Sequence, residues 1–493
     1  MSLNAVPDTG DRDMNRWATM AILAGVLARL AYIEQPFVDA WSWRQADMAM
    51  IARHFFHEGL AIAWPRIDWV GDAPGYVGTE FPLLPAAAAL GYHVVGTHEW
   101  VARVLSVVAF AAAAAMLYSL IARVNDRRTA AWGIAAFSAM PLSIMSGRSF
   151  MSDMTALAFA LGAIINIWRW LEDPASTSRA IGAALALSLA VLVKPTLAVI
   201  GVPLVYLVLA IRGASAFTNP RLWLVAIAAL TPPALWYWHA LFVARTFPPF
   251  HMFGDGGIGV VSVRQYLDRL NTFVLDGTTV VLAGVALAGA FVAFPRDRPR
   301  YLFHWWAVSC VFFTVVAGVG TRHPWYQLPT LIPVAAWVGA ACGRLTSWQS
   351  RAAKPMVACV LLLAAAESWH ALRPSYVSWA EPLRRAGMAV RELTPSDARV
   401  VFIDQGDPSG LYYTERRGWH FLALAGSIPD TSAEAIASLE DLRRRGASVL
   451  VATRYTTWWI DEFPRFGDHV RRNYPELAKT PDYTIWNLRP GGQ

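Results

Sequence analysis

The sequence predicts an α-helical polytopic membrane protein that carries a small C-terminal extracytoplasmic α/β domain. Only 16% of its 493 residues are charged and 56% are hydrophobic, whereas soluble globular proteins carry about 25% charged residues. Long apolar runs follow one another along most of the chain, and a helix needs roughly 20 apolar residues to cross a bilayer. Beyond Leu372 the apolar runs shorten and charges become frequent, which indicates a separate soluble part.

Eleven apolar runs are candidate spans, and one shorter run is a candidate interfacial helix. The shorter run covers 82–96 and begins "FPLLPAAAAL", so we expect it to enter the membrane only to half depth. The eleven candidate spans are 17–33, 101–122, 129–147, 154–171, 179–193, 196–211, 221–242, 275–294, 301–319, 325–343 and 354–371.

The distribution of Lys and Arg predicts the orientation. Five loops rich in these residues fall on one side when eleven spans are counted, and basic loops mark the cytoplasmic side. They are "ARVNDRR" (122–128), "RWLEDPASTSR" (169–179), "RGASAFTNPR" (212–221), "PRDRPR" (295–300) and "RLTSWQSRAAK" (344–354). The N-terminus is therefore expected in the cytoplasm, and a complete crossing by 82–96 would break this agreement.

The net charge of +7 does not indicate a nucleic-acid partner, because the basic residues lie in short clusters between apolar runs. Cys310, Cys342 and Cys359 all lie inside apolar runs without a CxxC spacing. They therefore predict neither a disulfide framework nor a cysteine metal site.

The predicted domains are a transmembrane domain over 1–371, with a first outer loop at 34–100, and an extracytoplasmic domain over 372–493. In the second domain "ARVVFID" (398–404) and "ASVLVATRY" (447–455) are predicted strands, and 432–446 is a predicted helix between them. This β-α-β pattern has no GxGxxG or Walker spacing, so nothing suggests a nucleotide.

Ionisable residues gather on the predicted outer side, near the ends of apolar runs. Charges at membrane depth are costly and often mark a site or a pathway. An acid can take a proton from an acceptor hydroxyl or amine, and cations can hold a departing phosphate. The residues are Asp39, Arg44, Asp47, Glu80, Arg148, Asp153, Lys194, Arg322 and His323.

Each residue also has a structural interpretation that the sequence leaves open. Asp39 could be a solvated loop residue, and Asp153 could simply complement the start of a helix. Lys194 could extend to the membrane interface, and the "RHP" segment at Arg322 could be an ordinary polar turn. We further expect Asp39, Trp43 and Asp47 to share one helical face because they are spaced four residues apart. Arg44 is then expected to pair with Asp39 or Asp47, or to face phosphate.

Several motifs occur in an order that resembles a known family. They are "GYVGTEFPLLP", "PLSIMSGRSFMSDMTALAF", "LAVLVKPT" and "RHPWYQLPTLIPVAAW", preceded by Asp39 soon after the first apolar run. The chain resembles, over roughly 17–345, the family 39-like glycosyltransferases of the GT-C fold, which include protein O-mannosyltransferases and the lipid A aminoarabinose transferase.

The resemblance implies transfer of a sugar from a polyprenyl-phosphate donor on the outer face of the bacterial inner membrane. It assigns Asp39 as the base or its orienting group and maps the other family acids onto Glu80 and Asp153. Phosphate-binding cations would be among Arg148, Lys194, Arg322 and His323, and the last motif adds Tyr326 to the substrate-binding set.

The chain also departs from this pattern. Relatives often carry an acidic pair where this chain has Asp39 and Ala40, and the aminoarabinose transferases have Lys where it has Phe81. Either Arg44 or another residue replaces that cation, or the donor binds in a different pose, and aminoarabinose is not assigned as the sugar.

The expected function is an inverting glycosyltransferase acting on an envelope lipid, glycan or protein. The Gly-rich loop 243–274 is expected to order on substrate binding. Two or three acids could hold a divalent metal, although no ligand spacing shows one. The rivals are a glycan ligase or phospholipid-headgroup transferase, and a non-catalytic transporter, flippase or scaffold for lipid-linked sugars. A transporter is expected to show repeated halves and mid-membrane charges, neither of which the sequence displays.

Overall fold

The computed structural model describes residues 9–253, 257–348, 350–421 and 431–489, and the chain divides into two compact units. Unit 1 comprises Met1–Ile33, Arg103–Tyr237 and Gly254–Pro374. Unit 2 comprises Glu34–Ala102, Trp238–Phe253 and Ser375–Gln493. The first outer loop therefore belongs to the same compact unit as the C-terminal sheet.

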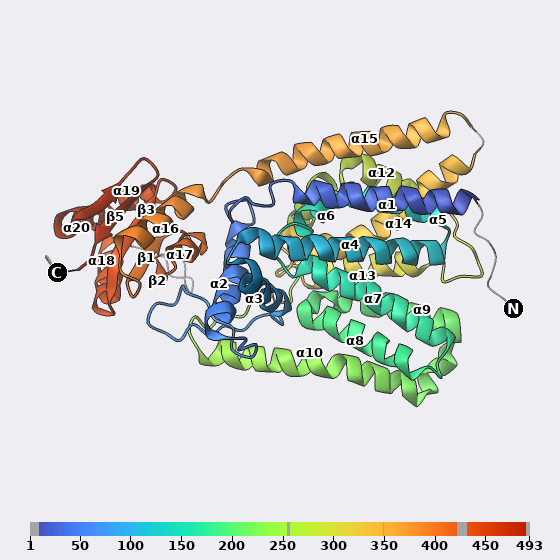
Figure 1. Cartoon of the computed structure of the whole chain (residues 1–493), viewed down its shortest axis with the longest axis horizontal. Coiled ribbons are helices and arrows are strands. Elements are labelled where there is room, and N and C mark those ends of the chain that lie inside the picture. Colours follow the sequence, from blue (N-terminus) through green and yellow to red (C-terminus); the bar gives the residue numbers. More distant parts are fainter. Residues whose placement is uncertain (1–8, 254–256, 349, 422–430, 490–493) are drawn as a thin grey trace. The chain divides into compact units, whose positions relative to one another are not determined.

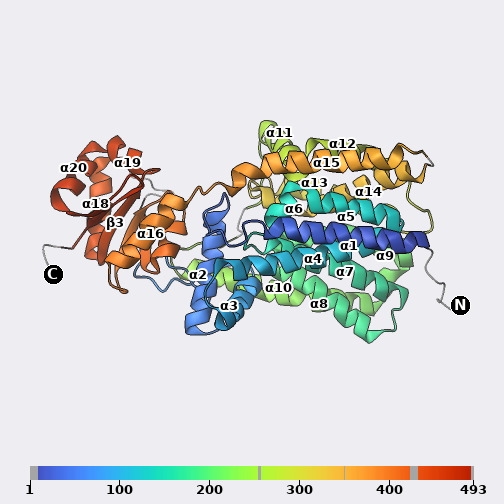
Figure 2. The ribbon, with the colours of Figure 1, turned by 45° about the horizontal axis from the view of Figure 1, so that its top comes forward.

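Unit 1 is built from helices, and its long helices run roughly side by side (Figures 1 and 2). The α-helices are α1 (Thr9–Leu30), α4 (Glu99–Val124), α5 (Arg127–Ala139), α6 (Pro141–Ser146), α7 (Asp153–Glu172), α8 (Thr177–Val193), α9 (Gly201–Arg212), α10 (Pro220–Thr246), α11 (Val263–Thr272), α12 (Val280–Gly289), α13 (Leu302–Val316), α14 (Leu331–Ser347) and α15 (Ala353–Leu372). Shorter 3₁₀ or π segments are η1 (Pro195–Ile200), η2 (Ala214–Thr218), η3 (Phe273–Thr278), η4 (Pro324–Thr330) and η5 (Arg373–Tyr376).

Several of these helices are long and apolar enough to cross a membrane. Among the described residues there are six such segments, or seven if the bent pair Val263–Thr278 and Val280–Gly289 forms one span. The six are Glu99–Val124, Asp153–Glu172, Pro195–Arg212, Pro220–Thr246, Pro324–Ser347 and Ala353–Leu393. Leu83–Val95, Thr177–Val193 and Leu302–Val316 are shorter apolar helices.

Every candidate span of the sequence analysis contains helix in the structure. The run 129–147 is divided between α5 and α6 at Met140, because Pro141 at the first position of α6 cannot continue the preceding hydrogen-bond ladder. The prediction of a continuous loop over 243–274 is wrong, since α10 extends to Thr246 and α11 begins at Val263. Ser262 and Gln265 cap the start of α11 through reciprocal hydrogen bonds. This helix-start motif was overlooked in the sequence because it follows a Gly-rich segment. Residues 254–256 of this loop lie outside the described residues.

Helices α5 and α14 pack closely because glycines leave room for the backbone of the other helix. A Cβ atom at Gly339 would collide with the Thr129 carbonyl oxygen, and one at Gly343 would lie 2.9 Å from Thr129 Oγ1. This seam holds the start of α5 against the end of α14.

Unit 2 combines helices of the first loop with a five-stranded mixed sheet. Its helices are α2 (Ser42–Glu58), α3 (Leu83–Val95), α16 (Glu381–Leu393), α17 (Ser409–Thr414), α18 (Ser432–Arg444), α19 (Thr457–Glu462) and α20 (Pro464–Asn473). The strands are β1 (Arg399–Ile403), β2 (Arg417–Phe421), β3 (Ala447–Thr453), β4 (Glu476–Lys479) and β5 (Tyr483–Asn487). The order is β2-β1-β3-β5-β4, with β1 parallel to β2 and β3, and β5 antiparallel to its neighbours.

The predicted strands at 398–404 and 447–455 and the helix between them are confirmed as β1, β3 and α18. The sequence patterns did not predict β2, β4 and β5, and two of these strands contain glycine or charged residues: Arg417 and Gly418 in β2, and Glu476 and Lys479 in β4. The apolar run 82–96 is the 13-residue helix α3. At 1.5 Å per residue it extends about 20 Å, which is less than the roughly 30 Å of a bilayer core.

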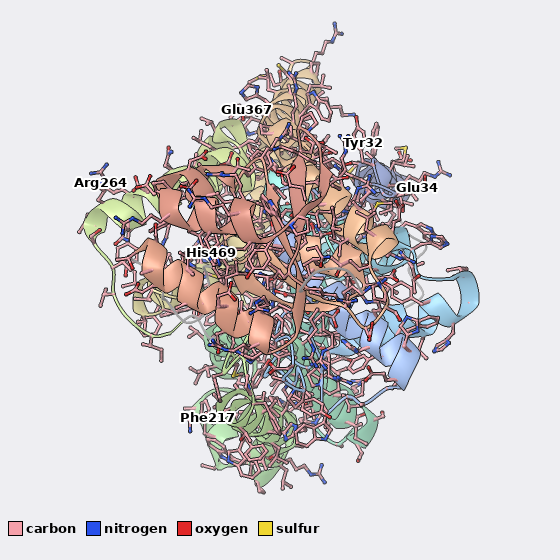
Figure 3. The ribbon with its side chains drawn as sticks, turned by 90° about the vertical axis from the view of Figure 1, so that its left-hand side faces the viewer. Tyr32, Glu34, Phe217, Arg264, Glu367 and His469 are labelled. Carbon is pink, nitrogen blue, oxygen red and sulfur yellow. The ribbon has the colours of Figure 1, made fainter. Side chains whose placement is uncertain are left out.

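The two faces of the sheet contact different partners. Val401 and Ile403 point to a face that packs on α18, α19 and α20, where His469 of α20 also contacts Glu440 of α18 at 2.8 Å (Figure 3). Val400 and Phe402 point to the opposite face, which packs on α16 and α17. First-loop side chains complete this second core, and they include Met50, Ile51 and Phe55 of α2 with Ile67, Trp69, Val70 and Val77.

Candidate functional site

Asp39 is fixed just before α2 rather than on the face of that helix. The helix begins at Ser42, so the prediction that Asp39 shares a helical face with Trp43 is wrong. One carboxylate oxygen, Oδ1, accepts hydrogen bonds from the Trp41 backbone amide at 3.0 Å and from Gln45 Nε2 at 2.8 Å. The side chain is fully buried, which does not fit a solvated loop residue.

Arg44 of α2 is paired with Glu80 of the first loop. Arg44 Nη2 lies 3.3 Å from Glu80 Oε2, and both side chains are buried. The guanidinium group also lies over the Phe253 ring, 4.7 Å from its centroid. The sequence analysis proposed Asp39 or Asp47 as partners of Arg44 and did not foresee Glu80. A buried charge is costly without a counter-charge, so this pair fixes α2 against the segment before α3.

Asp47 is also buried, and its partner is an indole. Trp69 Nε1 donates a hydrogen bond of 3.0 Å to Asp47 Oδ1. Burial raises the pKa of Asp47 to about 6, although the nearby Arg44 and the Trp69 hydrogen bond oppose this rise. A carboxyl group with such a pKa changes its charge within a mildly acidic range.

His420 of β2 and two acids of the loop after β1, the buried Asp404 and the half-buried Asp407, complete this cluster, and the sequence patterns did not single them out. His420 Nδ1 lies 2.8 Å from both carboxylate oxygens of Asp404, and its ring centroid is 5.2 Å from that of Trp69. Burial raises the pKa values of Asp404 and Asp407. Burial alone would lower the pKa of His420, but the Asp404 carboxylate together with Asp47 and Asp407 outweighs burial, so the pKa is raised.

Asp404 and His420 could have been found from the sequence, because each lies at or near the end of a strand. Asp404 follows β1 directly and His420 lies near the end of β2, at the carboxyl ends of two parallel strands. The connection after β1 contributes Leu411 to one core, while the connection after β2 contributes Leu439 to the other. Where the connections after two adjacent strands run to opposite faces of the sheet, they form a topological switch point. Binding sites in α/β sheets are often found at such points.

A second set of polar contacts holds α2 against α17. Arg53 Nη2 lies 2.6 Å from Asp68 Oδ2, and Arg53 Nη1 donates to the Tyr412 carbonyl at 2.7 Å. His54 Nε2 lies 2.8 Å from Asp68 Oδ1, and its Nδ1 lies 2.9 Å from Glu58. Through these contacts the C-terminal part of unit 2 fixes the helix that carries Arg44 and Asp47.

In unit 1, Asp153 and Lys194 form a buried ion pair. Lys194 Nζ lies 3.2 Å from Asp153 Oδ1, and both side chains are almost fully buried. Lys194 therefore does not extend to an interface, and Ser152 makes no side-chain capping bond. Lys194 Nζ also lies 5.4 Å from the centre of the Tyr326 ring, so the structure brings three predicted site residues together.

Arg148 has a different environment. Its side chain is fully buried, and Nη2 donates a hydrogen bond of 2.9 Å to the carbonyl oxygen of Tyr32. Tyr32 follows α1 closely, since that helix ends at Leu30. Arg148 thus ties the turn before α7 to the end of α1.

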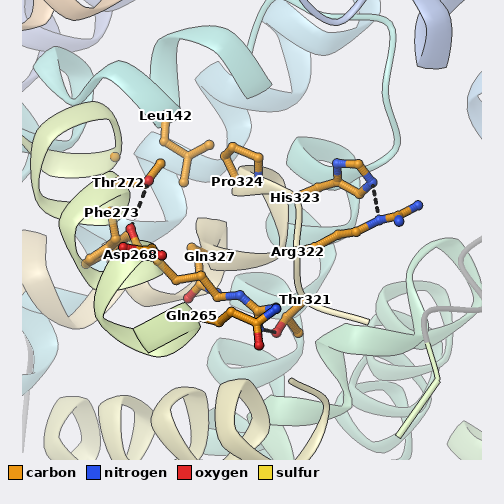
Figure 4. Close-up of a pocket in the computed structure, with 12 residues that line it drawn as sticks. Leu142, Gln265, Asp268, Thr272, Phe273, Thr321, Arg322, His323, Pro324 and Gln327 are labelled. Carbon is orange, nitrogen blue, oxygen red and sulfur yellow. Dashed lines mark hydrogen bonds between the residues drawn. The ribbon is translucent and has the colours of Figure 1, made fainter. Parts of the chain in front are cut away.

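Arg322 and His323 line a cavity of about 290 Å³ within unit 1 (Figure 4). Arg322 Nε lies 3.2 Å from His323 Nε2, and the His323 ring stacks on Trp325 with centroids 4.4 Å apart. Arg269 of α11 lines the same cavity and donates to Thr321 Oγ1 at 2.9 Å. The sequence analysis missed Arg269 because it treated its helix as a loop.

The sequence left open a site for a divalent metal, but the described side chains do not form one. Among the described residues, no three His, Cys, Asp or Glu side chains are gathered in a way that could hold a metal ion. The buried acids are satisfied mainly by cations or N–H donors, such as Lys194 for Asp153 and Gln45 for Asp39.

The Asp153–Lys194 pair predicts a specific pattern of stability. Replacing one partner, as in Asp153→Asn or Lys194→Gln, leaves the other charge buried and should cost about 3–5 kcal/mol. The double variant leaves neither charge and should be more stable than either single variant. Thermal unfolding of the four proteins in one detergent measures this coupling, and strictly additive single effects would contradict it.

The Asp47 carboxyl predicts a dependence of stability on pH. Its pKa is about 6 in the folded protein against 3.8 ordinarily, so folding favours the protonated form. The stabilisation is complete below about pH 4 and is lost as the pH rises to about 6, by at most about 3 kcal/mol. His420, whose pKa is also raised, extends the loss above pH 6.5.

Melting temperatures at pH 4.5 and 6.5 test this expectation. The Asp47→Asn variant should lose less stability between these pH values than the wild type does. Asp461→Asn, which removes an exposed carboxyl of the same unit, is the matched control and should follow the wild type. Equal pH dependence of wild type and Asp47→Asn would refute the assignment.

Comparisons with known proteins agree with this architecture. Residues 75–238 match the sequence family described as dolichyl-phosphate-mannose-protein mannosyltransferase. No curated protein sequence matches the chain significantly. The structure of ArnT from Cupriavidus metallidurans bound to undecaprenyl phosphate is 14% identical with a TM-score of 0.69, covering 96% of this chain and 98% of that chain.

Two further structures show the same likeness at similar identity. The apo oligosaccharyltransferase of Archaeoglobus fulgidus is 13% identical, with a TM-score of 0.57 over 89% of this chain and 69% of that chain. The mycobacterial arabinofuranosyltransferase AftD is 14% identical, with a TM-score of 0.54 over 97% of this chain and 42% of that chain. The chain therefore is a multi-pass membrane protein with the GT-C fold that these structures share.

Proposed function

We propose that the protein is an integral membrane glycosyltransferase that moves a hexosyl or pentosyl group from a polyprenyl-phosphate donor to an envelope acceptor. The acceptor is a lipid, a glycan or a protein, and transfer occurs on the outer face of a bacterial inner membrane. The five basic loops favour a cytoplasmic N-terminus. The soluble domain at 372–493 then lies outside the cytoplasm.

The observation that carries this proposal is the near full-length likeness to a structure solved with undecaprenyl phosphate. That likeness covers 96% of this chain and 98% of that chain, so it includes the first loop and the C-terminal sheet. A fold alone does not define a reaction. The buried acids and cations of the first loop and of the turns of unit 1 supply the chemistry that the reaction needs.

Asp39 is the proposed base. It takes the proton of the acceptor hydroxyl or amine while the acceptor atom bonds to the anomeric carbon of the sugar. The bond from that carbon to the phosphate oxygen breaks in the same step, and polyprenyl phosphate leaves with the bonding electrons. One displacement of this kind inverts the anomeric centre. The Trp41 amide and Gln45 fix the orientation of the carboxylate by binding Oδ1.

The cavity at Arg269, Arg322 and His323 is the proposed position of the donor phosphate. Arg322 is exposed there, whereas Arg148 and Lys194 are buried and hold a carbonyl oxygen and a carboxylate. Charge-assisted hydrogen bonds from guanidinium groups suit phosphate oxygens. Lys194, Asp153 and Tyr326 of the same unit would then shape this site. In unit 2, Arg44, which is paired with Glu80, is the proposed substitute for the cation that relatives carry at the position of Phe81.

The experiment below also distinguishes two alternative functions. A glycan ligase or a phospholipid-headgroup transferase would use similar cations without needing Asp39 as base. A transporter, flippase or scaffold would bind lipid-linked sugars without breaking the phosphate–sugar bond. The decisive observable is therefore release of polyprenyl phosphate that depends on Asp39.

The test supplies the purified protein with a panel of polyprenyl-phosphate sugars and membrane extract as the source of acceptor. Mass spectrometry follows the free polyprenyl phosphate. The wild type should release it, and Asp39→Asn should slow release by about 100-fold or more, because a general base contributes on that scale. Glu34→Gln removes an exposed acid of the same loop and should retain activity.

Equal release by wild type and Asp39→Asn would reject Asp39 as the base and direct attention to Asp153 or Glu80. No release from any donor, with folded protein and active extract, would reject the transferase and favour transport or a scaffold.

A further inference from the structure

A second cavity lies at the other end of the helices of unit 1, among the basic loops. Its volume is about 700 Å³, which is within the range of small-molecule sites. Its walls come from the start of α1, the turn between α4 and α5, the end of α14 and the start of α15. The charge pattern assigns this end to the cytoplasm.

Four cations line this cavity, and we name them the cytoplasmic basic cluster: Arg127, Arg128, Arg344 and Lys354. They come from two loops that are more than 200 residues apart in the sequence. The two acids of the lining are Asp13 and Asp126, and Asp126 Oδ1 already accepts the Thr129 backbone amide at 2.7 Å as a helix cap. Cations therefore outnumber acids in the lining by four to two.

The packing of α5 on α14 brings the two loops together. A side chain larger than hydrogen at Gly343 would press on Thr129, and Trp132 Nε1 donates to Thr346 Oγ1 at 3.2 Å. These contacts lie beside Arg127 and Arg344. The close packing of α5 on α14 thus holds several positively charged side chains near one another. Their mutual repulsion is unfavourable unless an anion is bound between them.

The need to orient the chain in the membrane explains why these loops are basic. It does not explain why cations from separate loops gather around one cavity. Positive charges set topology wherever they stand in a short loop. Other arginines at this end are used within the fold: Arg179 and Arg221 donate to the carbonyl oxygens of Arg169 and Pro174, each at 3.2 Å. The side chains of Arg128, Arg344 and Lys354 make no hydrogen bond or ion pair with another described residue, whereas the carbonyl oxygen of Arg344 accepts a hydrogen bond from Ser347 Oγ.

We propose that the cytoplasmic basic cluster binds the phosphate headgroup of an anionic membrane lipid. Arginine and lysine supply the charge-assisted donors that phosphate oxygens accept, and basic pockets between membrane helices recognise such headgroups. Val292, Ala293 and Ala340 add an apolar part to the same wall, which suits the glycerol and first methylenes of a lipid better than a free ion. The site is independent of the proposed sugar transfer.

The test titrates the purified full-length protein with phosphatidylglycerol or phosphatidylcholine and counts bound lipids by native mass spectrometry. Wild type should bind phosphatidylglycerol at least tenfold more tightly than phosphatidylcholine. The Arg127→Gln/Arg344→Gln variant should lose roughly tenfold or more of that affinity, as expected for lost hydrogen bonds to a charged group. Arg179→Gln/Arg221→Gln removes equal charge at the same end outside the cavity and should change the affinity less than threefold.

Equal losses in both variants would overturn the proposal, because they would report only the general surface charge. Competition by inorganic phosphate at millimolar concentration would likewise overturn it in favour of a free-anion site. If the first variant does not fold, Arg128→Gln/Lys354→Gln tests the same cavity through two exposed residues, and unchanged affinity there would reject the site.

Discussion

The shared core between the first loop and the C-terminal sheet is the constraint on which the proposed site depends. Met50, Ile51 and Phe55 of α2 pack with Phe402 and Val451 of the sheet, and all are almost fully buried. Burying such side chains stabilises the fold by about 1.5–3 kcal/mol each. This core fixes α2, and α2 fixes Arg44 and Asp47. The C-terminal part of unit 2 therefore holds the first loop in place.

The buried charges described above in both units are matched by a counter-charge or by hydrogen-bonding groups, such as the Tyr32 carbonyl oxygen that Arg148 binds. Glu80 matches Arg44, Lys194 matches Asp153, and Asp404 matches His420. Such pairs contribute little net stability, but the loss of one partner is costly, so they specify geometry. Rigid, desolvated charges are also what transition-state stabilisation requires. Under the proposed function, the same contacts would also hold the charged groups around the site in fixed positions.

The sequence predicted the helical architecture well because apolar length is a local property. It also predicted β1, α18 and β3, whose patterns are strong. The partners of the buried charges were harder to predict because they are distant in the sequence. Arg44 is 36 residues from Glu80, and Asp47 is 22 residues from Trp69. His420 and Asp404 were missed because only the parallel register of β1 and β2 brings them together. Arg269 was missed because a Gly-rich segment concealed the capped start of α11.

The stereochemistry of transfer tests the central claim most directly. The purified protein in nanodiscs would receive a polyprenyl-phosphate donor whose sugar carries ¹³C at the anomeric carbon, together with membrane extract. Nuclear magnetic resonance of the product would then give its anomeric configuration. We expect inversion relative to the donor, because the proposed base Asp39 would activate the acceptor for one displacement. Retention would contradict it, since that outcome requires an intermediate bonded to the protein or a reaction without this displacement.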